Sequence, residues 1–152
     1  MEQKIKLTKT WFYILSLTWG LPLTLIGALI ALGLRLTGHR PKRFGWVRYF
    51  ETGKDWGGLE LGLFFVRCEN ADRRLSEHEF GHAIQNCVFG PLTPILITLP
   101  SIARYWYRRG SESLGKIPRS GYDDVWFEGQ ASRLGRRYMA RIDDIQAKKR
   151  NI

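Results

Sequence analysis

The sequence predicts an α+β protein that is mainly helical, with one N-terminal transmembrane helix followed by a small domain containing a short β-hairpin or small sheet. Three observations predict it. Residues 10–34 contain no charged side chain. The stretches 46–51 and 59–67 are typical of strands, and in the second stretch Leu59, Leu61, Leu63 and Phe65 fall on one face by period two. Helical patterns cover 69–86 and 122–149.

The chain is short and basic. It has 152 residues, with 24 Lys and Arg against 14 Asp and Glu, and a formal net charge of +10. The length excludes a large multidomain enzyme, and a hydrophobic content of 44% excludes a disordered polycation. The two cysteines, Cys68 and Cys87, are too few for a disulfide framework. The charge leaves two acidic partners to consider, nucleic acid and an anionic membrane surface.

Residues 10–34 are long enough to cross a bilayer as a helix. They would extend about 37 Å, which exceeds a hydrocarbon core of about 30 Å. Trp11, Phe12 and Tyr13 stand at one end, where aromatic rings settle among lipid headgroups. A cleaved signal peptide fits poorly, because its apolar region would be about 7–15 residues long. We therefore expect a single-pass membrane protein with residues 1–9 as a basic N-terminal flank.

Basic residues flank this segment unequally. Three lysines precede it, whereas six basic residues follow it within residues 35–54. Because positive charge favours the cytoplasmic side, this count predicts an external N-terminus and a cytoplasmic domain. If the three lysines act as a cluster, they favour the opposite orientation. Residues 35–45 are basic and rich in turn formers, which predicts a linker, and the domain would then occupy residues 46–152.

A second uncharged run covers residues 83–103. Pro91, Pro94 and Pro100 interrupt it, so it is not a simple spanning helix. We expect a re-entrant hairpin that is broken near Pro94 and anchored at its exit by the arginine- and tyrosine-rich stretch 104–109. An apolar piece of the domain core or of the membrane interface is the other interpretation.

The chemistry of the chain concentrates in the sequence His78-Glu79-Phe80-Gly81-His82. Residues four apart lie one above the other on a helix, so both imidazoles can offer a nitrogen to one Zn²⁺. Glu79 lies on the adjacent flank, where its carboxylate can take a proton from water on the metal. Glycine inside a helix costs about 1 kcal/mol against alanine, so Gly81 suggests that another backbone packs closely there. The alternative is two incidental histidines beside a surface glutamate.

A catalytic zinc needs a third protein ligand and an open coordination position. Simpler roles explain the other candidates. His39 is expected to be a solvated histidine of the linker and Cys68 a small buried thiol, and Asp123 and Asp124 are expected to cap a helix. Cys87 points away from the metal face of the helix. Glu128 lies in an apolar helical setting, where an unpaired carboxylate is costly, and is our third ligand. Ser132, one turn later, is expected to hydrogen-bond a ligand. An exposed glutamate on an amphipathic helix is the alternative for Glu128.

The pattern His-Glu-Phe-Gly-His at 78–82 with Glu-Gly-Gln-Ala-Ser at 128–132 resembles the gluzincin class of zinc metallopeptidases. In that class the third ligand is a glutamate on a downstream helix, so the resemblance implies a small zincin-like metallopeptidase domain. It implies that the ligands of one Zn²⁺ ion are His78, His82 and Glu128. It also implies Glu79 as the catalytic base. Residues 76–90 and 122–132 further resemble a group of small bacterial membrane proteins of unassigned function.

These features predict a membrane-anchored zinc metallopeptidase or related hydrolase in which Glu79 is the general base towards zinc-activated water. Tyr122 or Tyr138 is the candidate donor to an oxyanion, and residues 59–67 could bind an extended peptide by strand addition. The expected partners are a bilayer with anionic headgroups and a peptide or protein substrate held near it. A catalytically inactive zinc-binding assembly or adaptor protein is the alternative. Nucleic acid is not expected, because basic clusters beside apolar segments are typical of headgroup contacts.

Overall fold

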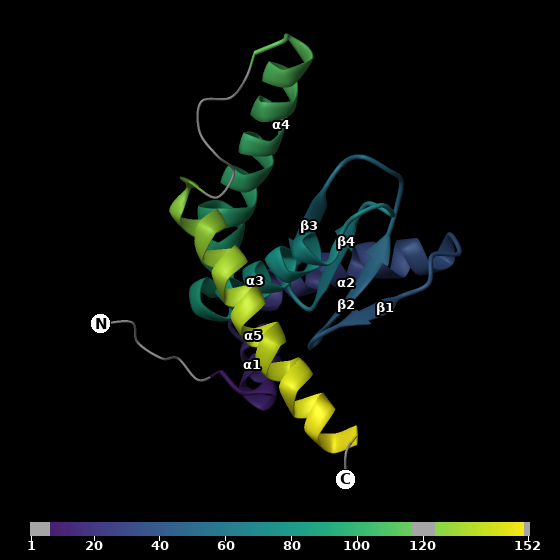
Figure 1. The fold of residues 1–152 in the computed structure, drawn as a ribbon, viewed down its shortest axis with the longest axis vertical. Coiled ribbons are helices and arrows are strands. Elements are labelled where there is room, and N and C mark those ends of the chain that lie inside the picture. Colours follow the sequence, from purple (N-terminus) through teal and green to yellow (C-terminus); the bar gives the residue numbers. More distant parts are fainter. Residues whose placement is uncertain (1–6, 117–123, 151–152) are drawn as a thin grey trace.

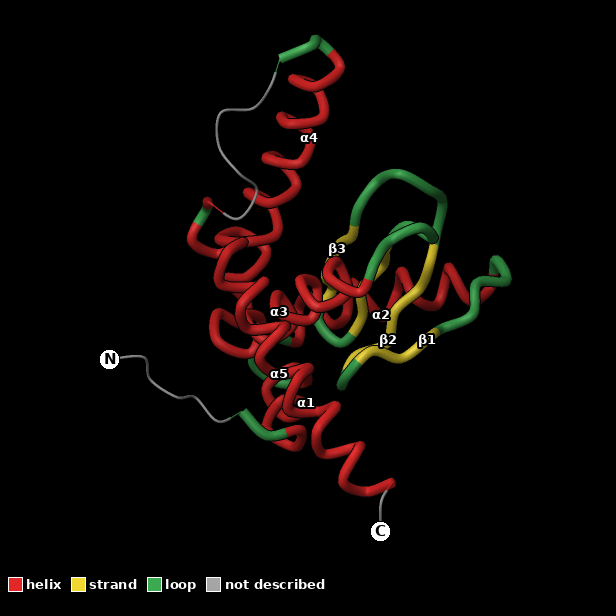
Figure 2. Tube along the Cα trace, in the orientation of Figure 1, coloured by secondary structure: helices red, strands yellow, loops and turns green. Residues whose placement is uncertain are grey.

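The computed structural model describes residues 7–116 and 124–150 and has an α+β fold, as the sequence predicts (Figures 1 and 2). The helices in these residues are α1 (Lys9–Leu17), α2 (Leu21–Leu36), α3 (Arg73–Phe89), α4 (Leu99–Ser113) and α5 (Trp126–Arg150). The short helical turns between α3 and α4 are η1 (Gly90–Leu92) and η2 (Pro94–Thr98). The strands are β1 (Lys42–Phe44), β2 (Val47–Glu51), β3 (Gly58–Leu61) and β4 (Phe64–Arg67).

The predicted transmembrane segment is not one continuous helix. It is divided into α1 and α2, which meet at an angle of 88°. Pro22 lies in the first turn of α2, where a helix leaves the N–H unpaired in any case, and Gly20 lies against the Asn86 side chain. Within residues 7–116 and 124–150, no single helix has both the length and the apolar composition to cross a membrane. Two pairs of successive helices have this length and apolar composition only when both members of a pair are counted together, and each pair is sharply bent.

The first half of this segment belongs to the domain core. Phe12 is fully buried, and its ring centroid lies 6.1 Å from that of Phe80 on α3. The N–H of Leu7 donates a hydrogen bond to the hydroxyl of Tyr138 on α5 at 3.0 Å. These contacts tie α1 to the two helices that carry the predicted metal ligands.

The sheet separates two helical layers. Its strand order is β1-β2-β4-β3, with β2 and β4 parallel and the other two pairs antiparallel. Phe65 packs with side chains of α1, α3 and α5, whereas its neighbour Val66 packs with Leu23 of α2, as the alternation of side chains along a strand requires. In Figure 1, α2 passes behind the strands.

The predicted strand 59–67 is in fact two strands. Gly62 has a φ of +74° and lies in the turn that joins β3 to β4, so the chain reverses inside the predicted element. Leu59 and Leu61 therefore pack on the α2 side of the sheet, whereas Phe65 faces the opposite layer. The single apolar face expected from period-two spacing is wrong, because the turn shifts the alternation.

The predicted linker 35–45 is mostly structured. α2 continues to Leu36, and β1 pairs with β2, where Phe44 lies opposite Val47. Residues 37–41 and Gly45 are the parts of it that lie outside helix and strand. The packing of α1, α2 and β1 extends the domain towards the N-terminus, beyond the predicted boundary at residue 46.

α3 carries the histidine motif through the centre of the molecule. Its N-terminus is capped by Asp72, whose side chain accepts a hydrogen bond from a backbone N–H of the first turn. α5 lies alongside α3 (Figure 2). A Cβ at Gly81 would collide with the carbonyl oxygen of Ala131, and a Cβ at Gly135 with that of Glu77. The two glycines let the helices approach, which confirms the close backbone contact expected at Gly81.

The second uncharged run turns sharply. The chain direction changes by 117° between Arg73–Leu92 and Pro94–Ser113. α3 ends at its C-cap Gly90, whose φ is +55°, and the break that follows lies beside Pro94, as predicted, because proline has no N–H to continue a helical hydrogen-bond pattern. None of the side chains of α4 is fully buried, and this helix projects away from the sheet (Figure 1).

Candidate metal centre

His78 and His82 lie on one face of α3, as their spacing predicts. Their Nε2 atoms are 3.0 Å apart, and the two rings are nearly perpendicular with centroids separated by 4.6 Å. Both side chains are buried, because α3 packs against the sheet on one side and α5 on another. Two imidazole nitrogens therefore face one point inside the protein.

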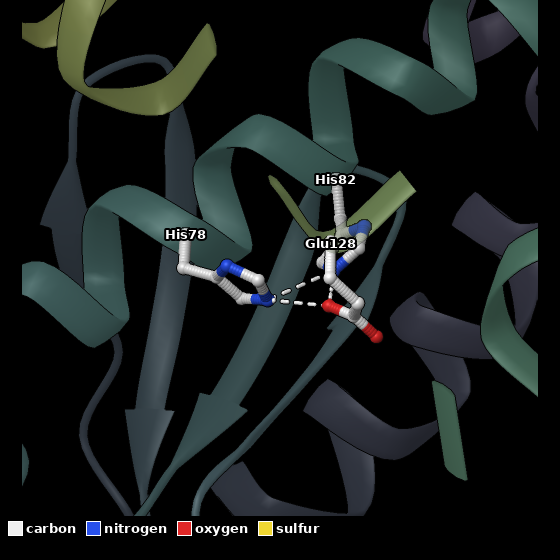
Figure 3. A group of neighbouring side chains, drawn as sticks. All are labelled: His78, His82 and Glu128. Atoms are coloured by element: carbon white, nitrogen blue, oxygen red, sulfur yellow. Dashed lines mark hydrogen bonds and ion pairs between the residues drawn. The ribbon is translucent and has the colours of Figure 1, made fainter. Parts of the chain in front are cut away.

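Glu128, in the first turn of α5, completes a group of three. Its Oε2 atom lies 2.9 Å from Nε2 of His78 and 3.1 Å from Nε2 of His82 (Figure 3). In Figure 3 both imidazoles point from α3 towards this carboxylate oxygen. The Glu128 side chain is fully buried, so the alternative of an exposed surface glutamate is wrong. The structure brings together all three predicted ligands.

The remaining ring nitrogens of both histidines are engaged. Nδ1 of His78 lies 2.9 Å from Oγ of Ser132, and Nδ1 of His82 lies 2.7 Å from Oε1 of Gln85. Such contacts fix ring orientation and direct each Nε2 at the shared point. The Ser132 contact is the one expected from its place on α5. Gln85 was not anticipated, although a residue three positions after a histidine shares its helix face.

The spacing of the three ligand atoms suits a zinc ion. Tetrahedral Zn²⁺ with bonds of about 2.0–2.1 Å places its ligand atoms about 3.3 Å apart. The separations of 2.9, 3.0 and 3.1 Å need only a small expansion to reach this value. Two imidazoles and one carboxylate are also a ligand set of catalytic zinc sites, which keep a fourth position for water or substrate.

Glu79 borders this group on the side of β3. Its side chain is buried, and the backbone N–H of Glu60 donates a hydrogen bond to its carboxylate. A Cβ at Gly58 would lie 2.5 Å from Oε1 of Glu79, so the glycine leaves room for the carboxylate. Burial raises the pKa of Glu79 to about 7; the charge of His82 opposes this rise, and the charge of Glu128 adds to it. A carboxyl with a pKa near neutrality suits a general base.

Glu128 has the opposite electrostatic setting. Burial by itself raises the pKa of this carboxyl, but hydrogen bonds with His78 and His82 outweigh burial and hold the pKa well below its usual range. The Ser101 hydroxyl at the start of α4 acts in the same direction. Glu128 is therefore an ionised carboxylate at neutral pH, which is the form that binds a cation.

A cleft of about 690 Å³ opens beside the group. His78, Glu79 and His82 line it, and so does β3, which lies at the edge of the sheet. The residues of α4 that line it are Ser101, Ile102, Tyr105, Trp106, Arg108, Arg109 and Glu112. An edge strand offers unpaired backbone groups to an extended chain. The structure narrows the predicted strand-addition site from residues 59–67 to β3.

Of the two predicted oxyanion donors, Tyr138 does not line the cleft. The ring of Tyr138 packs edge-on against Trp46 in the core, where its hydroxyl accepts the hydrogen bond from Leu7. Tyr138 also lies about 15 Å further along α5 than Glu128, which places it away from the ligands. Tyr122 lies outside the described residues.

Three other ligand candidates also lie elsewhere. Cys68 and Cys87 are buried free thiols, and the carbonyl oxygen of Phe12 accepts from the Cys87 thiol. Nδ1 of His39 lies 3.1 Å from the hydroxyl of Thr37, beyond the end of α2. Among residues 7–116 and 124–150, the only group of three metal-ligating side chains close enough to hold one ion is His78, His82 and Glu128.

Comparison of the chain with protein-family models, with curated proteins and with solved structures gives no match. The chemistry of the site is therefore inferred from its own side chains and their geometry.

Proposed function

We propose that the protein is a membrane-associated zinc-dependent metallopeptidase or related hydrolase. The observation that carries this proposal is the convergence of three buried ligand atoms, all within 3.1 Å of one another, beside a carboxyl group that borders an open cleft. His78, His82 and Glu128 would hold the ion, and Glu79 would act on the substrate side. The gluzincin-like order of these residues supports the same assignment.

In the proposed reaction the ion and Glu79 have different roles. Bound Zn²⁺ would supply Lewis-acid polarisation of water and of the scissile carbonyl group. Glu79 takes the proton of the attacking water and passes it to the leaving group. The hydrogen bond from the N–H of Glu60 holds the carboxylate in place between these steps. Exclusion of bulk water by the buried ligands strengthens each electrostatic contact.

The substrate class follows from the edge strand. In β3, Leu59 pairs across to Val66 of β4, so the backbone groups of the alternate residues Gly58 and Glu60 point outward. The N–H of Glu60 is engaged by Glu79, so a peptide would pair with the carbonyl oxygen of Glu60 and the backbone of Gly58. A peptide laid along this edge would pass directly beside the Glu79 carboxylate. The strand thus supports a peptide or protein substrate bound in extended form.

The test combines metal content with hydrolysis. Detergent-purified wild-type protein should hold one zinc ion and cleave a peptide library, and Glu79→Gln should keep the ion but lose cleavage by about 10³-fold or more, since its amide cannot accept the proton. Glu69→Gln is the matched control, because Glu69 is exposed at the entry to α3. Full activity of Glu79→Gln would remove Glu79 from the mechanism.

The assignment of the three metal ligands is tested by measuring bound zinc, without an activity assay. His78→Ala, His82→Ala and Glu128→Ala should each lower the zinc stoichiometry measured by atomic emission after dialysis, because each removes one of three bonds to the ion. Unchanged stoichiometry in Glu128→Ala would overturn its assignment as the third ligand.

An inactive zinc-binding assembly or adaptor protein is the second candidate, and the deep burial of the ligand atoms favours it. A structural site is closed, whereas a catalytic site keeps a position for an exchangeable ligand. Replacement of zinc by Co²⁺ separates the two, since the cobalt spectrum of an open site should change when a hydroxamate is added. An unchanged spectrum together with inactive wild-type protein would favour the structural role.

A further inference from the structure

Apart from Arg35 in its last turn, the face of α2 that points away from the domain is apolar. The inward face packs on the sheet, where Gly27 lies against Leu61 and Thr24 lies against Gly62. The large side chains exposed on the other side are Leu25, Ile26, Leu29, Ile30, Leu32 and Leu36. A surface helix normally carries polar residues along its outer face, so an outer face as apolar as that of α2 indicates a second partner.

A second exposed apolar segment meets this one. At its centre the indole N–H of Trp19, in the bend between α1 and α2, donates a hydrogen bond to the carbonyl oxygen of Val88. The Trp19 ring also lies against Gly90 in η1. The exposed side chains on either side of this junction are Trp11, Ile14, Leu17, Leu92, Ile95 and Leu99. Two segments far apart in the sequence therefore form one surface, named here the apolar surface.

The segments that form the apolar surface carry charges of one sign. Residues 3–50 contain eight basic residues and no acidic residue, and residues 83–111 contain three basic residues and no acidic residue. Lys9, Arg35 and Arg40 are exposed at the two ends of α1–α2. Tryptophan, as at positions 11 and 19, favours the boundary between headgroups and acyl chains. An apolar surface with a basic border and tryptophans is complementary to an anionic bilayer.

The contacts of α1 with the domain core indicate whether the N-terminal segment could cross such a bilayer or would lie on one side of it. Phe12 is locked beside Phe80, Leu7 is bound to Tyr138, and the hydroxyl of Tyr13 donates to the carbonyl oxygen of Trp46. α2 is held against the sheet over its first three turns. To cross a membrane, the chain would have to remove Phe12 from the core that positions the metal ligands.

We infer that the apolar surface inserts into one leaflet of an anionic bilayer, so that the protein binds the membrane from one side and residues 10–34 do not cross it. The inference does not depend on the proposed hydrolysis. It also places the cleft beside the membrane, because η2 presents Ile97 to the cleft and Ile95 and Leu96 to the apolar surface.

Flotation with vesicles tests the inference. Detergent-purified protein is diluted into vesicles of phosphatidylcholine alone or of phosphatidylcholine and phosphatidylglycerol in equal parts. Wild-type protein should float more completely with the anionic vesicles, and less so at high salt. Leu25→Glu and Leu29→Glu should each weaken vesicle binding by at least about tenfold, because each replaces a leucine that is exposed in the free protein and would be buried in lipid on binding. The control Ile145→Glu makes the same change at a similarly exposed position on α5 and should bind as wild type.

Zinc content, measured in detergent, shows that each variant is folded. If Leu29→Glu keeps its zinc and still floats as wild type does, the assignment of this surface is overturned. A stable dimer that Leu29→Glu converts to monomers, without flotation of either protein, would assign the surface to a second copy of the chain instead. Loss of vesicle binding with intact hydrolysis would overturn this inference alone, and intact binding without hydrolysis would overturn the proposed function alone.

Topology is tested by labelling in sealed membrane vesicles. Lys9→Cys and Arg40→Cys place thiols at the exposed ends of α1–α2, whereas Cys68 and Cys87 are buried and supply the background. A membrane-impermeant maleimide should modify both new thiols from the same side of the membrane. Modification from opposite sides would show a spanning segment and overturn the inference.

Discussion

At the scale of single residues, the site separates two glutamates by their surroundings. Glu128 is held between two imidazoles and stays ionised, whereas Glu79 is buried beside β3 and has a pKa of about 7. Neighbouring carboxyls with pKa values moved in opposite directions are typical of a pair with distinct chemical roles. Here they correspond to a ligand and a proton carrier.

The raised pKa of Glu79 predicts how the metal-free protein responds to pH. Between its ordinary pKa of 4.5 and about 7, the folded protein holds a proton that the unfolded chain releases. The resulting stabilisation is complete below pH 4.5 and is lost as the pH rises to about 7, by about 3 kcal/mol at most. Urea unfolding in the presence of a chelator should therefore show stability falling with pH.

Glu79→Gln is the control for that measurement. Burial also raises the pKa of Glu60 in both proteins, whereas the smaller contribution of the Glu79 charge to that rise is lost in the variant, so the difference between their pH profiles reports Glu79 together with its effect on Glu60. The variant should have a shallower decline between pH 4.5 and 7. Identical profiles would show that Glu79 has no raised pKa in the folded protein.

Ser132 and Gln85 orient the histidines, so their removal should weaken metal binding without abolishing it. Ser132→Ala and Gln85→Ala each lose a hydrogen bond to a ring Nδ1. The expected loss is about 10–100-fold in zinc affinity, measured by competition with a chromophoric chelator. Ser113→Ala, at the end of α4, should have wild-type affinity. An unchanged affinity in both site variants would mean that packing alone orients the rings.

Gly58 should be required for activity and not for metal binding. A methyl group at this position would lie 2.5 Å from Oε1 of Glu79 and would displace the carboxylate, while the three ligands remain untouched. Gly58→Ala is expected to keep its zinc and to lower kcat for peptide hydrolysis by at least about tenfold, since a small misplacement of a catalytic group is costly. Gly110→Ala, whose Cβ meets open space, is the control.

At the scale of elements, the decisive feature is the contact between α3 and α5. The histidines and Glu128 come together only because Gly81 and Gly135 remove two Cβ atoms from this contact. The sequence shows Gly81 inside the motif, and this position alone indicates a close neighbour. It does not identify that neighbour as α5, because close approach of two helices depends on side chains of both.

Gly135→Ala should therefore impair the metal centre from a distance. Its Cβ would collide with the carbonyl oxygen of Glu77, and overpacking of this kind costs about 1–3 kcal/mol. As the helices separate, Glu128 moves away from the histidines and zinc affinity falls. Thermal unfolding with and without zinc should show a smaller stabilisation by the ion than in wild type. An equal stabilisation would show that the helices adapt without moving Glu128.

The path of the N-terminal segment is also decided at this scale. Its length and lack of charge favour a single span, and nothing local to it indicates that Phe12 is needed in the core. The bend at Gly20 becomes understandable only with Asn86 beside it. Hydropathy treats the segment by itself, whereas its course depends on contacts with α3, α5 and the sheet.

At the scale of the whole molecule, charge and apolar area divide the protein into two sides. One side carries the exposed apolar residues of α1, α2 and η2 within a basic border, and the metal cleft lies next to it between β3 and α4. If the proposed membrane contact is correct, part of the net charge of +10 lies where it would attract an anionic bilayer. The proposed hydrolase would meet substrates at the bilayer surface.

The sequence by itself determined the local features of this protein. Helical periodicity places His78 above His82, the capping residues Asn70, Asp72 and Ser76 leave three possible starts for α3, and Pro94 marks the break in the second apolar run. Each depends on residues within a few positions, so spacing alone is enough. The tertiary structure decided the rest: the meeting of Glu128 with the histidines, the support from Gln85, the division of 59–67 into β3 and β4, and the course of α1. Those features arise from packing between segments distant in the chain, where the position of one backbone depends on the side chains of another.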